Sequence, residues 1–172
     1  MDHQTPDSAS TASAMFSGIK TNSWTVGYDS TIVHSDPESQ LEEHKVKSII
    51  HHAQEAGKDT GIVTSTRITH ATPSAMYAHS ADRDWECWHD LEKDKVEDKT
   101  HDIAWQLMNQ DPGKSLKVML GGGRAAFRPK SEEREITDDD YSWDCHTQER
   151  LFPLENVYML TTHKHICFQR FH

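Results

Sequence analysis

The chain has 172 residues, of which 34% are hydrophobic and 27% are charged, and its formal net charge is −10 with histidine counted as neutral. This length is sufficient for one domain with a buried core, but the composition is polar for a self-contained globular domain and indicates a fragment or a partly disordered chain. The acidic balance and the lack of a basic stripe argue against a nucleic-acid partner, because binding to a phosphate backbone requires clustered lysine and arginine.

The sequence carries little information about the cellular compartment. Its three cysteines, Cys87, Cys145 and Cys167, are an odd number without the spacing of a metal or redox motif. No apolar run is long enough to span a membrane, and Met1 is not followed by a basic and then apolar leader. Candidate catalytic residues follow Met1 almost at once, so we expect the chain to be truncated at its start.

The first predicted element is a helix that begins near Asp7 and Ser8 and ends at Gly18. Aspartate and serine are preferred N-caps, and glycine is the preferred residue just after a helix. A serine at a helix N-terminus also faces unpaired N–H groups and the positive end of the helix dipole, which suits a phosphate. By itself, the segment predicts only a helix cap.

A second helix is predicted from Pro37 to Gly57, since proline is favoured in the first turn of a helix. Its apolar residues lie at a helical spacing that predicts one buried face: Leu41, Val46, Ile49, Ile50, Ala53 and Ala56. The adjacent His51 and His52 point to different faces, so we do not expect them to share a metal ion.

The following segments alternate between strand and helix patterns. The sequence predicts strands over residues 60–66 and 116–120, a helix capped by Thr72-Pro73 that runs to His79, and a helix over residues 100–111. A glycine turn at residues 121–124 follows the second strand. This order predicts the α/β class with a parallel sheet.

Other segments are predicted to lack a regular apolar face. Residues 90–99 have mixed charge and predict a solvated loop or an exposed helix. Residues 131–140 are acidic and predict a loop or disorder. Residues 151–172 show no clear period, and the chain therefore divides into residues 1–127 and an irregular tail over residues 128–172.

Three segments, in the same order, resemble animal alkaline phosphatases of the insect-like kind: DHQTPDSASTASA at residues 2–14, GIVTSTRITHATP with YAHSADRDW at residues 61–85, and LGGGR at residues 120–124. The resemblance implies a fragment, truncated at both ends, of a three-layer α/β fold with a mainly parallel central sheet. Residues 1–127 would be a partial catalytic domain, and residues 128–172 a tail of doubtful family membership.

The resemblance implies a phosphate monoester hydrolase that works through a phosphoserine intermediate. Ser8 corresponds to the nucleophile, which is also a zinc ligand, and Asp7 to the residue that holds the active-site arginine. Arg83 corresponds to the arginine that clamps the phosphate. Thr72 corresponds to a magnesium ligand, and His70 to a residue just behind that metal.

Each of these residues also has a structural interpretation. Asp7 or Ser8 can be an N-cap only, and so can Thr72 before a proline. His70 can be an ordinary loop histidine, and Arg83 can form a weak surface ion pair with a neighbouring aspartate. Arg67 has no predicted role.

The resemblance further implies zinc and magnesium cofactors, a metal-activated water, a homodimer, and a GPI-anchored location at the cell surface. The metal ligands that the family has before the nucleophile and in a downstream Asp-His-x-His cluster are not found in this sequence. We therefore expect weak metal binding and little or no activity of the chain alone. No leader or anchor signal is found.

Two alternatives stay open. The chain can be a non-catalytic partial gene product or interaction fragment, which the irregular tail favours. A metal buffer built from its 13 histidines is a weaker alternative, because they are scattered along the sequence.

Overall fold

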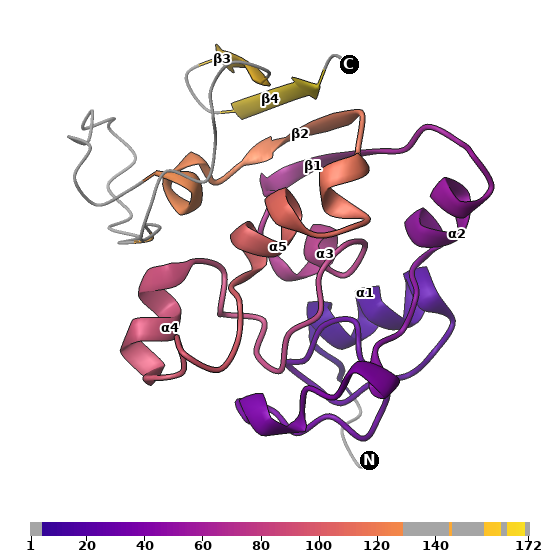
Figure 1. Cartoon of the computed structure of the whole chain (residues 1–172), viewed down its shortest axis with the longest axis vertical. Helices are drawn as coiled ribbons and strands as arrows, with labels where there is room; N and C mark the ends of the chain where they lie inside the picture. Colours follow the sequence, from indigo (N-terminus) through magenta and orange to yellow (C-terminus); the bar gives the residue numbers. More distant parts are fainter. Residues whose placement is uncertain (1–4, 129–144, 146–156, 163–164, 171–172) are drawn as a thin grey trace.

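The computed structural model describes residues 5–128, residue 145, and residues 157–162 and 165–170. Its elements follow one another along the chain as shown in Figure 1. The helices are α1 (Ser8–Ser17), α2 (Ile49–Glu55), α3 (Ala71–Ser74), α4 (Trp88–Asp94) and α5 (Ile103–Asn109). The strands are β1 (Gly61–Arg67), β2 (Val118–Gly122), β3 (Val157–Thr162) and β4 (His165–Arg170), and short 3-10 turns lie at η1 (Pro37–Ser39), η2 (Glu42–His44), η3 (Gly113–Ser115) and η4 (Arg124–Phe127).

One four-stranded sheet has the order β1-β2-β4-β3. β1 and β2 are parallel, with Gly61 opposite Val118 and Ile62 opposite Met119. β3 and β4 form an antiparallel hairpin that pairs with β2 on the side away from β1 (Figure 1). The α/β class is confirmed, and the parallel pair is joined by an antiparallel hairpin within the described part of the sheet.

The prediction of an irregular tail over residues 128–172 is wrong for the segment that forms β3 and β4. This segment contains strand-favouring residue types such as Val157, Tyr158 and Ile166, and β2 offers a row of backbone groups for pairing. The sequence pattern is ambiguous because these residues do not alternate regularly with polar ones. The acidic residues 131–140 lie outside the described residues.

The helix predicted from Pro37 to Gly57 is wrong over its first half. Asp36 caps only the η1 turn, and its carboxylate accepts a hydrogen bond from the Glu38 N–H at 3.0 Å. Lys45 is extended and bridges to Tyr28, so the chain cannot continue as a helix there. α2 starts only after Ser48.

The third helix also begins elsewhere than predicted. The N-cap of α3 is His70 rather than Thr72, because the His70 backbone is extended and its carbonyl accepts the Ser74 N–H at 3.0 Å. Thr72 therefore lies inside the first turn. The helix predicted over residues 100–111 is confirmed as α5, but it starts after Asp102 rather than at Thr100, and the Asp102 carboxylate accepts the Trp105 N–H at 2.6 Å.

The buried apolar residues form three clusters. The largest lies between the sheet and α5 and includes Ile62, Leu107 and Leu116. A second cluster of small residues packs α1 against α3. The third includes Leu91, so α4 has one buried side although residues 90–99 were predicted to be solvated. Within the described part of the chain, no helix is long and apolar enough to cross a membrane.

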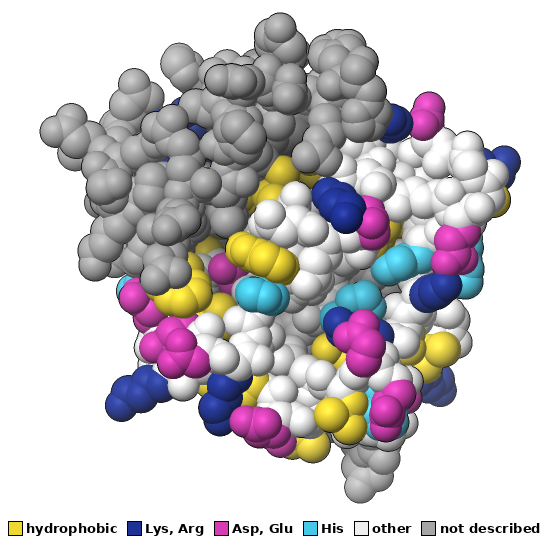
Figure 2. All heavy atoms as spheres, viewed as in Figure 1, with side chains coloured by type: hydrophobic (Ala, Val, Ile, Leu, Met, Phe, Trp, Pro, Cys, Tyr) yellow, Lys and Arg dark blue, Asp and Glu magenta, His cyan; other side chains and the backbone are white. Residues whose placement is uncertain are grey.

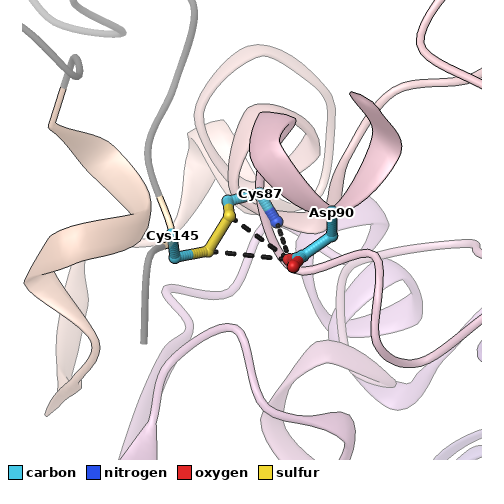
Figure 3. Close-up of side chains that lie close together, drawn as sticks. All are labelled: Cys87, Asp90 and Cys145. Carbon is cyan, nitrogen blue, oxygen red and sulfur yellow. Dashed lines mark hydrogen bonds between the residues drawn. A yellow bond between two sulfur atoms is a disulfide. The ribbon is translucent and has the colours of Figure 1, made fainter. Parts of the chain in front are cut away.

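Cys87 and Cys145 form a disulfide beside the start of α4, with their Cα atoms 5.8 Å apart (Figure 3). The Asp90 carboxylate accepts the Cys87 N–H at 3.1 Å and contacts both sulfur atoms. Burial raises the pKa of Asp90 to about 6. The three side chains lie close enough to share a metal ion, but a disulfide has no thiolate to offer one.

Candidate functional site

The N-terminus of α1 is built around the Asp7 carboxylate. It accepts hydrogen bonds from the Ala9 N–H at 2.9 Å, the Ser10 N–H at 3.2 Å and the Ser10 hydroxyl at 2.6 Å. The helix ends at Gly18, whose φ of 76° is the left-handed conformation that glycine favours. The predicted start and end of this helix are both confirmed.

The same carboxylate also holds two groups from outside the helix. One oxygen accepts the Trp24 N–H at 3.0 Å, and the other accepts from Arg83 Nη1 at 3.2 Å. Burial favours a raised pKa for Asp7, but the hydrogen bonds from Ser10, Trp24 and Ala9 outweigh burial and lower the pKa to about 2. Asp7 is therefore ionised throughout the neutral and alkaline range.

The Arg83 guanidinium contacts several of the other residues of the site. Its Nη1 donates to the Ser8 Oγ at 2.6 Å, and its Nη2 lies 3.2 Å from the His70 Nε2. The side chain is 14% exposed. The structure thus brings together residues from the start of α1, the loop before α3 and the segment after it, which are far apart in the sequence.

His70 is neutral in this position. Burial lowers its pKa, and the nearby Arg67 and Arg83 lower it further, against the opposing effect of Glu86. Because its Nε2 accepts from Arg83, the proton lies on Nδ1, which is buried and has no hydrogen-bond partner among the residues that the structure describes.

Thr72 is exposed and shares a cavity of about 260 Å³ with Ser8. Within the described chain the two hydroxyls form no hydrogen bond with each other, and they only line the same cavity. The cavity lies along α1 and is lined by Pro6, Asp7, Ser8, Thr11, Ala12, Met15 and Thr72.

Arg67, which has no role predicted from the sequence, is 39% exposed and forms an ion pair with the buried Glu86. Its Nε and Nη2 contact the two Glu86 oxygens at 2.9 and 2.5 Å, and the Thr69 hydroxyl donates to the same carboxylate at 2.6 Å. A side chain at Gly123, whose φ is 90°, would lie 2.9 Å from the Arg67 Cβ. The last glycine of the LGGGR segment is therefore structural. The sequence gives no signal for this pair, because its partners are joined only by tertiary contact.

The residues around Ser8 do not form a metal site by themselves. The Asp7 carboxylate is occupied by its hydrogen-bond donors. The remaining candidate metal ligands are the hydroxyls of Ser8 and Thr72 and the imidazole of His70. In the described part of the chain, the only cluster of three His, Cys, Asp or Glu ligand atoms is the one at Cys87, far from Ser8 in the sequence. The predicted zinc and magnesium ions do not fit the described residues alone.

The described residues form no continuous basic stripe on the face shown in Figure 2. On the face shown in Figure 2, lysine and arginine side chains of the described residues are interspersed with aspartate and glutamate. This agrees with the acidic balance of the sequence.

The fold and the cluster at Arg83 together define an α/β protein with a serine, an aspartate and an arginine at one helix N-terminus. A family model described as alkaline phosphatase matches residues 1–151. The chain belongs to the alkaline phosphatase family.

Several known proteins are similar to this chain in sequence. It is 49% identical to alkaline phosphatase 4 of Drosophila melanogaster over 123 residues, which are 72% of this chain and 20% of the relative. It is 40% identical to the membrane-bound alkaline phosphatase of Bombyx mori over 134 residues, or 77% of this chain and 24% of the relative. The chain therefore spans about a quarter or less of these curated relatives.

The fold is also similar to that of a solved structure, the alkaline phosphatase from the Antarctic bacterium TAB5. The TM-score is 0.52 at 30% identity, and the match covers 73% of this chain and 28% of the other.

Proposed function

We propose that this chain carries the phosphate-binding part of a phosphate monoester hydrolase, with Ser8 as the phosphoryl acceptor and Arg83 as the phosphate ligand. The observation that carries the proposal is the 2.6 Å hydrogen bond from Arg83 Nη1 to the Ser8 Oγ at the start of α1. A phosphate bound by this guanidinium would lie beside the serine oxygen, as in-line attack requires. Residues 1–127 would form this partial catalytic domain.

In the reaction, the Ser8 oxygen would form a bond to phosphorus while the bond from phosphorus to the alcohol leaving group breaks. Arg83 can hold two phosphate oxygens through its planar fork, and Asp7 keeps that fork aimed at Ser8. The helix N-terminus adds backbone N–H groups that favour negative charge.

The described residues supply no effective base for the serine proton. Asp7 has a pKa of about 2 and is occupied by its donors, and the accepting nitrogen of His70 faces Arg83. A metal ion could lower the pKa of the serine or activate a water, but the described residues do not fit one. We therefore propose little or no turnover by this chain alone.

The alternative, a non-catalytic interaction fragment, is supported by the same lack of a described metal-ligand set around Ser8. The two proposals predict different results for phosphate binding. Only the proposed phosphate site requires binding that depends on Arg83.

A location at the cell surface is also proposed. The disulfide between Cys87 and Cys145 is typical of an oxidising compartment, and one relative is named as membrane-bound. A lipid anchor and a homodimer follow from the family resemblance only.

Two measurements test the proposed function. Hydrolysis of p-nitrophenyl phosphate at alkaline pH with zinc and magnesium should show no turnover above that of the Ser8→Ala variant; clear Ser8-dependent turnover would contradict the proposed inactivity. Inorganic phosphate, titrated by NMR, should bind weakly and lose that binding in Arg83→Gln but not in Lys58→Gln, which removes an exposed cation elsewhere. Binding that ignores Arg83 would contradict the proposed site.

A further inference from the structure

Trp24 lies over the Arg83 guanidinium. The carbon at the centre of the guanidinium is 5.4 Å from the centroid of the indole ring, within the range of a cation–π interaction. Trp24 is 45% exposed, so this contact lies at the surface of the protein.

The Trp24 backbone is tied to the same site. Its N–H donates to the Asp7 carboxylate at 3.0 Å, and its carbonyl accepts the Arg83 N–H at 2.8 Å. One residue therefore contacts both partners of the Asp7–Arg83 ion pair through its main chain, and one of them also through its ring.

The conformation of Trp24 is strained. Its φ of 69° is in the left-handed region, which is uncommon and strained for a bulky residue. Such strain persists where surrounding contacts impose it and is concentrated at functional sites. Here the two backbone hydrogen bonds impose it, and the result is that the ring covers the guanidinium.

The Trp24 ring has a second neighbour. The His34 ring lies 6.0 Å from the Trp24 ring at a tilt of 38°, and His34 Nε2 is 2.9 Å from an Asp82 carboxylate oxygen. The indole therefore contacts an imidazole as well as the guanidinium that it covers.

We propose that Trp24 is a positioning residue for Arg83. A ring over the face of the guanidinium restricts its tilt and leaves its edge N–H groups free for Ser8, Asp7 and an incoming phosphate. The part of this inference that concerns phosphate rests on the proposed function; the part that concerns Arg83 does not.

The first test is the NMR signal of the Arg83 Nε–H group in the full chain, assigned by its loss in Arg83→Lys. An indole ring above the guanidinium shifts this signal away from that of a solvated arginine. We expect the shift to be lost in Trp24→Leu, kept in reduced form in Trp24→Phe, and unchanged in Trp105→Leu, which removes an indole that stacks on His101 instead.

Trp24→Gly provides a second variant in case Trp24→Leu does not fold. Glycine adopts a φ of 69° without strain, so the backbone contacts to Asp7 and Arg83 can persist while the ring is absent. We expect the same loss of shift as in Trp24→Leu. An Arg83 signal that is the same in the wild type, Trp24→Leu and Trp24→Gly would overturn the inference.

The second test follows that signal during titration with inorganic phosphate at constant ionic strength. Loss of the cation–π contact should weaken phosphate binding about 2- to 5-fold in Trp24→Leu and Trp24→Gly, with rescue in Trp24→Phe. Equal affinity in the wild type and Trp24→Leu would overturn the positioning role. A wild-type signal that does not respond to phosphate would contradict the proposed function, while the ring dependence of the signal would still support or overturn the inference.

Discussion

Asp7 illustrates how much a single residue does in this chain. It caps α1, accepts the Trp24 N–H and pairs with Arg83, so one carboxylate connects the helix start to both partners of the candidate site. The cap is predictable from the local sequence. The contact to Arg83, 76 residues away, has no local signal and is indicated only by the family resemblance. The contact to Trp24, 17 residues away, is not predicted at all.

Replacement of Asp7 tests this connection. Its pKa is about 2 in the fold against an ordinary value of 3.8, so ionised Asp7 stabilises the fold above about pH 4, and this contribution is lost as the pH falls towards 2. Asp7→Asn should lower the free energy of unfolding by about 2 kcal/mol near neutral pH and by less near pH 3. Urea unfolding measures this, with Asp59→Asn at an exposed position as the control. An equal loss at both pH values would contradict the pKa argument.

At the scale of single elements, α5 is the helix whose prediction from sequence succeeds best. Ile103, Ala104 and Leu107 are buried as their helical spacing predicts, although the helix is capped by Asp102 and not opened at Thr100 as predicted. α2 is the contrary case, because a proline after an aspartate starts only a 3-10 turn and a backbone bridge to Tyr28 interrupts the helix. Apolar spacing identifies a buried helical face, but it does not reveal contacts between distant backbones.

The cap of α5 has a pH dependence of the opposite sign to that of Asp7. Burial raises the pKa of Asp102 to about 7, above its ordinary value of 3.8. The neutral, protonated form of Asp102 therefore stabilises the fold relative to the ionised form. Its contribution to the free energy of unfolding is complete below about pH 4 and is lost as the pH rises through about 7.

Asp102→Asn keeps a good N-cap and removes the buried charge. The difference in free energy of unfolding between Asp102→Asn and the wild type should shift in favour of the variant by about 1–3 kcal/mol from pH 4 to pH 8. Thermal melts at a series of pH values measure this, and Asp102→Ala, which loses the cap, should be less stable than Asp102→Asn throughout. A difference between Asp102→Asn and the wild type that stays constant with pH would show that Asp102 does not titrate in this range.

At the scale of the whole molecule, the pairings that join distant segments are the least predictable from sequence. The resemblance in three segments indicates that Ser8, His70 and Arg83 belong together, whereas the Arg67–Glu86 pair and the Cys87–Cys145 disulfide leave no local pattern. Cysteine count and spacing cannot identify a bridge between residues 58 positions apart.

The disulfide gives a prediction at this scale. Closing so long a loop typically stabilises a fold by about 2–4 kcal/mol. A dithiol reductant or the double variant Cys87→Ala with Cys145→Ala should therefore lower the melting temperature, and the double variant should no longer respond to the reductant. Cys167→Ser is the matched control and should respond to reductant like the wild type. A wild-type melting temperature that is the same with and without reductant would contradict the prediction.

The short hydrogen bond between Arg83 and Ser8 has a consequence for the chemical reactivity of the serine. The Arg83 nitrogen that donates to the serine hydroxyl is also one of the groups that would bind an oxyanion, so the resting protein already occupies part of its own anion site. An anion that reaches this nitrogen competes with the serine oxygen for its N–H. Binding of the anion there would loosen the nucleophile in the same step.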